Sequence, residues 1–210
     1  MSSFQSYIEK LARKIEEHSI PEGTNLGPFG AFKKLDVERL KTKGAREAAV
    51  LILLHPLQEA WHIALIQRPV YEGVHGGQIA FPGGKLEEGE SYQAAAYRET
   101  QEEIGVNSDL LHHIGDLDPI FIPPSQFIVY PFVAFADKEL SFTKEEAEVD
   151  EILHFPLDSL DFKHSQRTEV FARNQVFNVP VFPLNDKVIW GATARILAEF
   201  CYYHQLLKHQ

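Results

Sequence analysis

The chain is poor in several features that would each indicate a particular class of protein. Its single cysteine, Cys201, excludes an intramolecular disulfide framework and a cysteine-based zinc site. Because Cys201 lies in a helical apolar pattern, a buried structural thiol is favoured over a nucleophile. No apolar run approaches the ~18 residues that a membrane-spanning helix requires. The N-terminus lacks the apolar core of a signal peptide, so we expect a cytoplasmic protein without a membrane partner.

Basic residues are outnumbered by acidic ones. The 210 residues include 20 lysines and arginines against 30 aspartates and glutamates, which gives a formal net charge of −10. Nucleic-acid-binding surfaces normally carry clustered lysine and arginine, so we expect no nucleic-acid partner. Small phosphorylated molecules remain suitable partners, because acidic groups gather divalent cations that neutralise phosphates.

An amphipathic segment precedes the main body of the chain. A helix over about residues 3–18 is predicted from apolar residues at helical spacing, namely Phe4, Tyr7, Ile8, Leu11 and Ile15. Glycines and prolines then indicate an irregular connector. We therefore expect residues 1–32 to form a helix and connector, and residues 33–210 to form one domain. The helix could pack on that domain or on a second subunit, which leaves a homodimer open.

Strands and helices are mixed through the rest of the chain. Residues 48–54 form a continuous apolar run, as expected of a strand covered on both faces. Helices are expected from about Ser91, as N-cap, to Ile104, with Gly105 as the stop, and over 192–207. The other expected strands are 61–66, 111–116, 128–136, 152–155, 169–172, 176–181 and 188–190, with a turn at Arg173-Asn174. This order predicts an α/β sandwich in which helices cover one sheet system.

Three glutamates share one face of the helix expected at 91–104. Glu99, Glu102 and Glu103 stand at positions i, i+3 and i+4. Like charges at this spacing cost a few tenths of a kcal/mol per pair, and a divalent cation such as Mg²⁺ would compensate them. Arg98 could pair with one of these carboxylates or with Glu90 and so orient them. Taken alone, such a cluster is more often a solvated acidic face.

The segment from Gly84 to Val106 resembles the Nudix box, G-x5-E-x7-R-E-U-x-E-E-x-G-U, with every fixed position filled at the right spacing. Only Thr100 falls where a larger aliphatic residue is usual. The resemblance implies a Nudix hydrolase domain over 33–210. Its fold would be an α/β/α sandwich with a mixed sheet and a loop–helix–loop metal-binding motif. Its activity would be hydrolysis of a diphosphate linkage in a nucleoside diphosphate derivative.

The same resemblance implies roles for individual residues. Mg²⁺ or Mn²⁺ would be bound by Glu99, Glu102, Glu103 and the backbone carbonyl of Gly83, with Glu90 and Arg98 in support. The general base that deprotonates the attacking water varies within the superfamily. The candidates here are Glu102, Glu103 and the loop acids Glu145, Glu146, Glu148 and Glu151, of which we favour Glu148. That acidic loop is itself more often a solvated surface.

Several segments resemble the coenzyme A pyrophosphatase branch of this superfamily, namely residues 65–68, 75–84, 148–149, 155–157 and 189–197. The implied reaction splits coenzyme A or an acyl-coenzyme A into 3',5'-ADP and 4'-phosphopantetheine. The expected substrate-binding residues are Arg68, Gly77, Phe81 and Gly84. Ile66, Pro69 and Gly73 replace the threonine, the serine or alanine, and the second arginine that are usual in this branch. A broader enzyme acting on ADP-ribose, NADH or nucleoside triphosphates therefore stays open.

Other side chains have two interpretations each. Arg68 could contact phosphate or be a surface arginine, and Trp190 and Phe127 could stack an adenine or belong to the core. Arg195 could hold a carboxylate, His75 favours local hydrogen bonding, and His112-His113 favours a strand edge. A non-catalytic Nudix sensing module would be expected to lose box glutamates, and all are present. Messenger-RNA decapping conflicts with the acidic charge.

Overall fold

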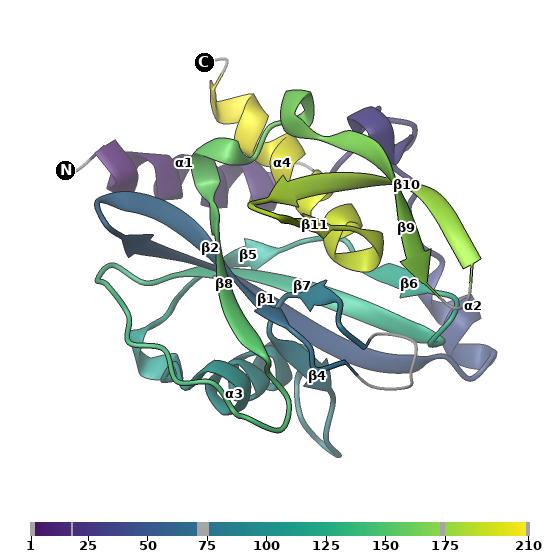
Figure 1. Cartoon of the computed structure of the whole chain (residues 1–210), viewed down its shortest axis with the longest axis horizontal. Helices are drawn as coiled ribbons and strands as arrows, with labels where there is room; N and C mark the ends of the chain where they lie inside the picture. The colour runs from purple at the N-terminus through teal and green to yellow at the C-terminus, as the bar shows by residue number, and fades with distance from the viewer. Residues whose placement is uncertain (1–2, 18, 71–75, 173–174, 209–210) are drawn as a thin grey trace.

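The computed structural model describes residues 3–17, 19–70, 76–172 and 175–208. Within these ranges, eight strands form one mixed sheet with helices on both faces (Figure 1). Strand β1 (Arg46–Leu57) pairs in parallel with β7 (Phe127–Phe135) and antiparallel with β2 (Ala60–Gln67). The remaining strands of this sheet are β3 (Ile79–Ala80), β4 (Gly83–Lys85), β5 (His112–Asp116), β6 (Ile120–Ile122) and β8 (Glu151–Pro156).

The central strand β1 is buried on both faces, as its apolar run predicts. Ala49, Leu51 and Leu53 face the core cluster that contains the apolar side of α3 (Tyr92–Ile104). The alternate residues Ile52 and Leu54 join the cluster that includes helices α1 (Ser3–Glu17) and α4 (Gly191–Lys208). Successive side chains of a strand point to opposite faces, so one strand serves both cores. The predicted α/β/α sandwich with a mixed sheet is confirmed.

The expectation of one sheet system is wrong. Strands β9 (Gln166–Ala172), β10 (Gln175–Leu184) and β11 (Lys187–Ile189) form a separate three-stranded antiparallel sheet, among the described residues, over the face that carries α4 (Figure 1). Val181, Phe182 and Leu184 are buried, and Phe182 packs in the core cluster of α4. The alternation of polar and apolar residues along a strand predicts which side chains are buried. It does not determine which other strand will pair with it through backbone hydrogen bonds.

Helix α1 packs against its own chain. Ile8, Leu11 and Ile15 are buried, and the hydroxyl of Tyr7 lies 2.7 Å from Nδ1 of His204 on α4. The apolar stripe predicted for this helix is thus covered by α4 and β5. The Cys201 thiol on α4 is buried, as predicted, and burial raises its pKa to about 12.

Short elements escape the sequence patterns. Helix α2 (Val37–Thr42), capped by the Asp36 carboxylate at 3.1 Å from the Arg39 N–H, was not predicted, nor were β3, β4 and β6. Strands of two or three residues are too short to show a periodicity. The turn expected at Arg173-Asn174 lies outside the described residues. None of the helices in the described ranges is long and apolar enough to cross a membrane.

Candidate active site

Helix α3 presents two glutamates to the end of the central sheet. Ser91 is its N-cap, accepting a hydrogen bond from the Ala94 N–H at 3.2 Å, and Gly105 ends it with a left-handed φ of 71°. Both predicted boundaries are confirmed. Residues advance by about 100° around a helix, so positions i and i+4 lie roughly 40° apart. Glu99 and Glu103 therefore share one side of α3.

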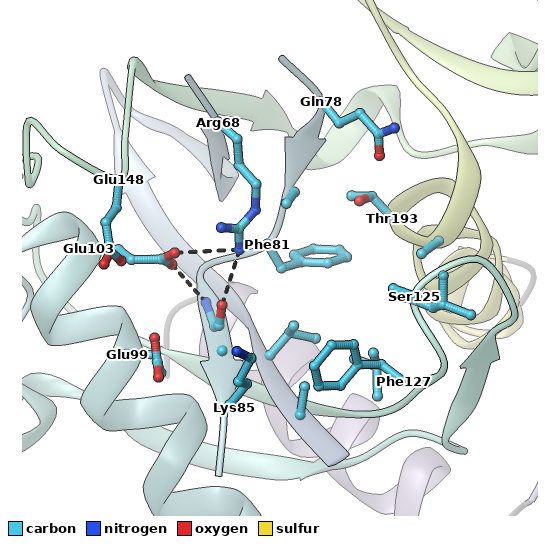
Figure 2. A pocket seen from close by; sticks show the side chains of 18 of the residues that line it. Arg68, Gln78, Phe81, Lys85, Glu99, Glu103, Ser125, Phe127, Glu148 and Thr193 are labelled. Atoms are coloured by element: carbon cyan, nitrogen blue, oxygen red, sulfur yellow. Dashed lines mark hydrogen bonds and ion pairs between the residues drawn. The ribbon is translucent and has the colours of Figure 1, made fainter. Parts of the chain in front are cut away.

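Glu103 is the most enclosed acid of the site. Its side chain is 1% exposed, and Oε2 accepts a hydrogen bond from the Gly83 N–H at 2.8 Å. Burial raises the pKa of this carboxyl to about 7, while Arg68 and the Gly83 N–H act in the opposite direction. The nearest cation is the guanidinium of Arg68, whose Nη2 lies 3.5 Å from Oε1. Figure 2 shows this arrangement at the wall of a pocket.

A third acid reaches the pair from a distant segment. One carboxylate oxygen each of Glu99, Glu103 and Glu148 lies within 4.8 Å of the others. Glu148 belongs to the turn before β8, which is fixed because the Glu145 N–H donates to the Glu103 carbonyl at 3.0 Å and Val149 is buried beneath it. The structure thus brings the loop acid that the sequence favoured as general base beside two of the predicted metal ligands.

Glu102 points away from this group. Its side chain is 56% exposed, and its Oε2 accepts a hydrogen bond from Nη1 of Arg98 at 2.9 Å. Around the helix axis, Glu102 lies roughly 60° from Glu99, on the side opposite to Glu103. The predicted trio of Glu99, Glu102 and Glu103 is therefore split, and Glu148 stands with the other two in place of Glu102.

Arg98 joins the helix to the loop before it. Its Nε and Nη2 donate to the two oxygens of Glu90, each at 3.0 Å, and Nη2 also donates to the Lys85 carbonyl at 3.1 Å. A further contact joins Nη1 to Oε1 of Glu99, at 2.8 Å. The sequence left two partners open for Arg98, a cluster carboxylate or Glu90, and the arginine holds both. These contacts fix the Glu99 carboxylate from its outer side.

Two adjacent glycines let strand β4 lie close to both α3 and β1. A Cβ atom at Gly84 would collide with the Glu99 carboxylate, and one at Gly83 would collide with the backbone of β1. Gly83 also has a φ of 147°, which L side chains rarely adopt. Its carbonyl oxygen accepts a hydrogen bond from Arg68 Nη2 at 3.3 Å and so faces the acids. The backbone of β4 can lie this close to α3 because Gly84 lacks a side chain, and this close to β1 because Gly83 lacks one.

A pocket of about 530 Å³ opens beside these groups, and we call it the acidic pocket. Its wall includes Arg68, Phe81 and Gly84, three of the four expected substrate-binding residues. Gly77 is not part of this wall in the described structure; its N–H donates to the Pro69 carbonyl at 3.0 Å. Figure 2 places Gln78, Ser125 and Thr193, to which the sequence analysis gave no role, around the same space.

Several residues that had two interpretations from the sequence alone have a defined position in the structure. Phe127 lines the acidic pocket, whereas Trp190 and Arg195 line a neighbouring hollow. His113 at the sheet edge lies 3.2 Å from an Asp116 carboxylate oxygen. His75 lies outside the described residues. No sequence signal identified Ser125, because it belongs to a loop that only the fold brings to the pocket.

Comparison with known proteins places this chain in a family. The family model of the NUDIX domain matches residues 45–175. The Nudix hydrolase NudL of Salmonella dublin is 33% identical over 161 residues, which is 76% of this chain and 83% of the relative. The protein of the same name from Salmonella newport is 32% identical over the same shares.

Solved structures share the fold at low identity. A MutT protein from Methanosarcina mazei matches 76% of this chain and 94% of its own length, with a TM-score of 0.50 and 15% identity. A MutT/nudix family protein from Enterococcus faecalis matches 99% of this chain and 76% of its own, with a TM-score of 0.50 and 16% identity. The family match covers more than half of the chain, and it includes the glycines of β4 and the acids of α3. The chain therefore belongs to the Nudix family and is a Nudix pyrophosphohydrolase.

Proposed function

We propose that this enzyme hydrolyses the diphosphate linkage of coenzyme A or an acyl-coenzyme A, with Mg²⁺ or Mn²⁺ as cofactor. The products are 3',5'-ADP and 4'-phosphopantetheine or its acyl derivative. The observation that carries the diphosphate chemistry is the meeting of Glu99, Glu103 and Glu148 at a pocket that Arg68 also lines. The carboxylates suit a divalent cation, and the guanidinium suits a phosphate oxygen.

The donor groups fit a hard divalent cation. Glu99, Glu103 and Glu148 offer carboxylate oxygens, and Gly83 offers a carbonyl oxygen that faces them. Three acids at this distance repel one another. Their counter-charges are Arg68, 3.5 Å from Glu103, and Arg98, 2.8 Å from Glu99. Arg98 also binds Glu90 and Glu102, so the group keeps an excess of negative charge. Mg²⁺ and Mn²⁺ prefer oxygen ligands of this kind. When bound, the cation supplies charge neutralisation at the phosphate oxygens and Lewis acidity.

Glu102 and Arg98 act from outside the group of three acids. Arg98 binds Glu102, Glu99 and Glu90 at once and so limits the positions that the Glu99 carboxylate can take. We assign Glu102 a supporting role, through Arg98 and through its negative charge. Outer contacts of this kind orient metal ligands and commonly change metal affinity or activity by about 10- to 100-fold when removed.

The chain's own residues bind the diphosphate and move the proton. Arg68, with 27% of its side chain exposed, can exchange its contact with Glu103 for a phosphate oxygen. Glu148 is the exposed acid of the group and accepts a proton from the attacking water. The water oxygen forms a bond to one phosphorus, the bond from that phosphorus to the bridging oxygen breaks, and the second phosphate leaves.

The coenzyme A assignment is supported by the resemblance of residues 65–68, 75–84 and 189–197 to the coenzyme A pyrophosphatase branch. Phe81 and Gly84 from the second of these segments and Thr193 from the third line the acidic pocket. One observation favours a broader specificity: Pro69, which departs from the branch pattern, also lines this pocket. The second candidate is thus a pyrophosphohydrolase of other nucleoside diphosphate derivatives, such as ADP-ribose or NADH.

A substrate panel separates the two candidates. Coenzyme A, acetyl-coenzyme A, ADP-ribose, NADH and a nucleoside triphosphate are compared with Mg²⁺ and with Mn²⁺, and the products are resolved by mass in ¹⁸O-labelled water. We expect the coenzyme A compounds to have a kcat/KM at least about tenfold above the others, a difference of roughly 1.4 kcal/mol. Equal turnover of ADP-ribose and coenzyme A would overturn the narrow assignment.

A further inference from the structure

A second hollow, of about 430 Å³, adjoins the acidic pocket, and we call it the basic hollow. The two share Gln78, Ile122 and Ala192 in their walls, so a single extended ligand could occupy both. The rest of the wall comes from the segment before α2, the loop around β6 and the start of α4. None of its residues belongs to the group of acids at the proposed reaction centre.

The charge of the basic hollow is opposite to that of the whole chain. Lys33 and Arg195 line it, and its described wall contains no aspartate or glutamate, in a chain of net charge −10. The nearby acid Glu199 does not fully neutralise Arg195. Its Oε1 accepts a hydrogen bond from the Asp118 N–H at 2.7 Å, and burial raises the pKa of its carboxyl to about 8. The hollow is therefore a local positive region.

Arg195 has an unused hydrogen-bond donor. Its Nη1 is buried and meets no acceptor in the described part of the chain, while its guanidinium lies 5.7 Å from the centre of the Phe32 ring. A buried, unpaired donor is costly, more so when it carries charge. Arg195 also lines the hollow, so a turn of its guanidinium toward an anionic oxygen there would give Nη1 the partner that the protein itself does not supply.

Lys33 is directed to the hollow by an extended segment. Ala31, Lys33 and Leu35 line it, as expected when alternate residues point to one side. The buried residue Phe32 fixes the segment, because its N–H donates to the Thr24 carbonyl at 2.7 Å. The next lysine, Lys34, is not part of the wall and interacts with Asp118 instead. The two neighbouring lysines are thus structurally distinct.

The remaining wall suits a nucleoside. Trp190 and Phe121 line the hollow and offer flat apolar surfaces for a base. The 18-residue helix α4 begins at Gly191, also in the wall, and the positive end of its dipole adds to Arg195 and Lys33. A base and an anionic group can be held together here.

We propose that the basic hollow binds a phosphate monoester on the ribose of a substrate whose diphosphate lies in the acidic pocket. Lys33 and Arg195 hold this monoester, and Trp190 contacts the base. The inference rests on the proposed function and deepens it, since it restricts the preferred substrates to nucleoside diphosphate derivatives with a further phosphate. A 2'- or a 3'-phosphate on the ribose would supply the same chemistry.

Metal-free binding measurements test this inference without turnover. The dissociation constants of adenosine 3',5'-bisphosphate, adenosine 2',5'-bisphosphate and adenosine 5'-monophosphate are measured by calorimetry for the wild type and for Lys33→Met, Lys34→Met and Arg195→Met. We expect the wild type to bind one bisphosphate at least about tenfold more tightly than the monophosphate, because charge-assisted hydrogen bonds contribute at this level. The preferred isomer identifies the position of the monoester.

The variants distinguish binding at a specific site from a general effect of positive charge. Lys33→Met should lower the preference for the bisphosphate several-fold, Arg195→Met should remove it, and Lys34→Met, which makes the same change in net charge, should leave it intact. Lys33 is exposed, so its replacement preserves the fold even if Arg195→Met does not. Equal binding of the three nucleotides by the wild type, or equal effects of the two lysine variants, would overturn the inference.

Coenzyme A hydrolysis by the same variants distinguishes this inference from the proposed function. If bisphosphate binding depends on Lys33 but no coenzyme A is hydrolysed, the proposed function fails and the subsite stands. If coenzyme A is hydrolysed with the same kcat/KM by the wild type, Lys33→Met and Lys34→Met, the subsite is wrong and the proposed function stands.

Discussion

Arg68 and Glu103 lie 3.5 Å apart, and both also contact the backbone of Gly83. Nη2 of Arg68 donates to the Gly83 carbonyl at 3.3 Å, and the Gly83 N–H donates to Glu103 at 2.8 Å. The end of β2, the start of β4 and the last turn of α3 therefore meet around the backbone of one residue, Gly83 (Figure 2). Because a backbone N–H holds Glu103, its position does not depend on the exposed Glu102.

This difference between neighbouring glutamates gives the first prediction. Glu103→Gln removes a buried charge from the group of three acids, so turnover should fall by about 10²- to 10³-fold. Glu102→Gln removes an exposed charge that contacts Arg98, and turnover should fall by about 10-fold to 100-fold. Steady-state kinetics with Mg²⁺ measure both, with thermal unfolding as the control for folding. A larger loss in Glu102→Gln would show that Glu102 is a principal ligand.

The second prediction concerns the close approach of β4 to α3. Gly84→Ala places a Cβ against the Glu99 carboxylate, so that carboxylate must move away from its present position. We expect at least a tenfold loss of turnover and a loss of about 1–3 kcal/mol in the free energy of unfolding.

Gly89→Ala is the matched control for this change. A Cβ at Gly89 would meet nothing within 4 Å, although its φ of 79° should still cost about 1–2 kcal/mol of stability. Turnover per folded molecule should therefore be preserved in Gly89→Ala. Equal turnover in the two variants would contradict the role given to the Gly84 contact.

Arg98 gives the third prediction. A lysine at this position cannot reproduce the paired contacts with both oxygens of Glu90 or reach Glu99 at the same time. We expect Arg98→Lys to lower turnover and the affinity for Mn²⁺ by about 10-fold or more. Calorimetric titration with Mn²⁺ measures the affinity. Unchanged Mn²⁺ binding would show that Arg98 does not orient the acids.

Much of this site could be predicted from the sequence, and there is a physical reason why the rest could not. The spacing of Glu99, Glu102 and Glu103 predicts a shared helical face, but their angular positions send Glu102 toward Arg98. Glu148 joins the group because the preceding turn is hydrogen-bonded to the end of α3, a contact between distant segments. Local spacing contains no information on such a contact.

The fold shows the same division between local and distant information. The apolar run at 48–54 predicts a strand buried on both faces, because that property depends on the strand's own residues. The separation of β9, β10 and β11 into a second sheet was not predicted, because it depends on hydrogen-bond partners. Lys33 was likewise not identified, since its role arises from the position of its segment beside α4.

The fourth prediction is a pH dependence of stability at Glu199. This carboxyl is 1% exposed, and burial raises its pKa to about 8. The folded state therefore holds the proton to a higher pH than the unfolded chain, so stability from this group is present at low pH. It is lost as the pH rises from the unfolded pKa, about 4.3, toward 8. A neutral side chain would avoid this loss.

Glu199→Gln tests the direction of the effect. The amide oxygen can still accept from the Asp118 N–H, so the variant should match the wild type near pH 4.5 and exceed it by about 1–3 kcal/mol at pH 8. Urea unfolding across this pH range measures the difference. A variant that becomes less stable than the wild type as the pH rises would show that the folded state stabilises the charged carboxylate.

The most direct test of the account is an anomalous difference map from a crystal of this enzyme soaked in Mn²⁺. The account predicts a manganese peak among the carboxylates of Glu99, Glu103 and Glu148, close to the Gly83 carbonyl. The peak should be lost in Glu103→Gln. A peak elsewhere, with these three side chains turned away from one another, would contradict the proposed metal site.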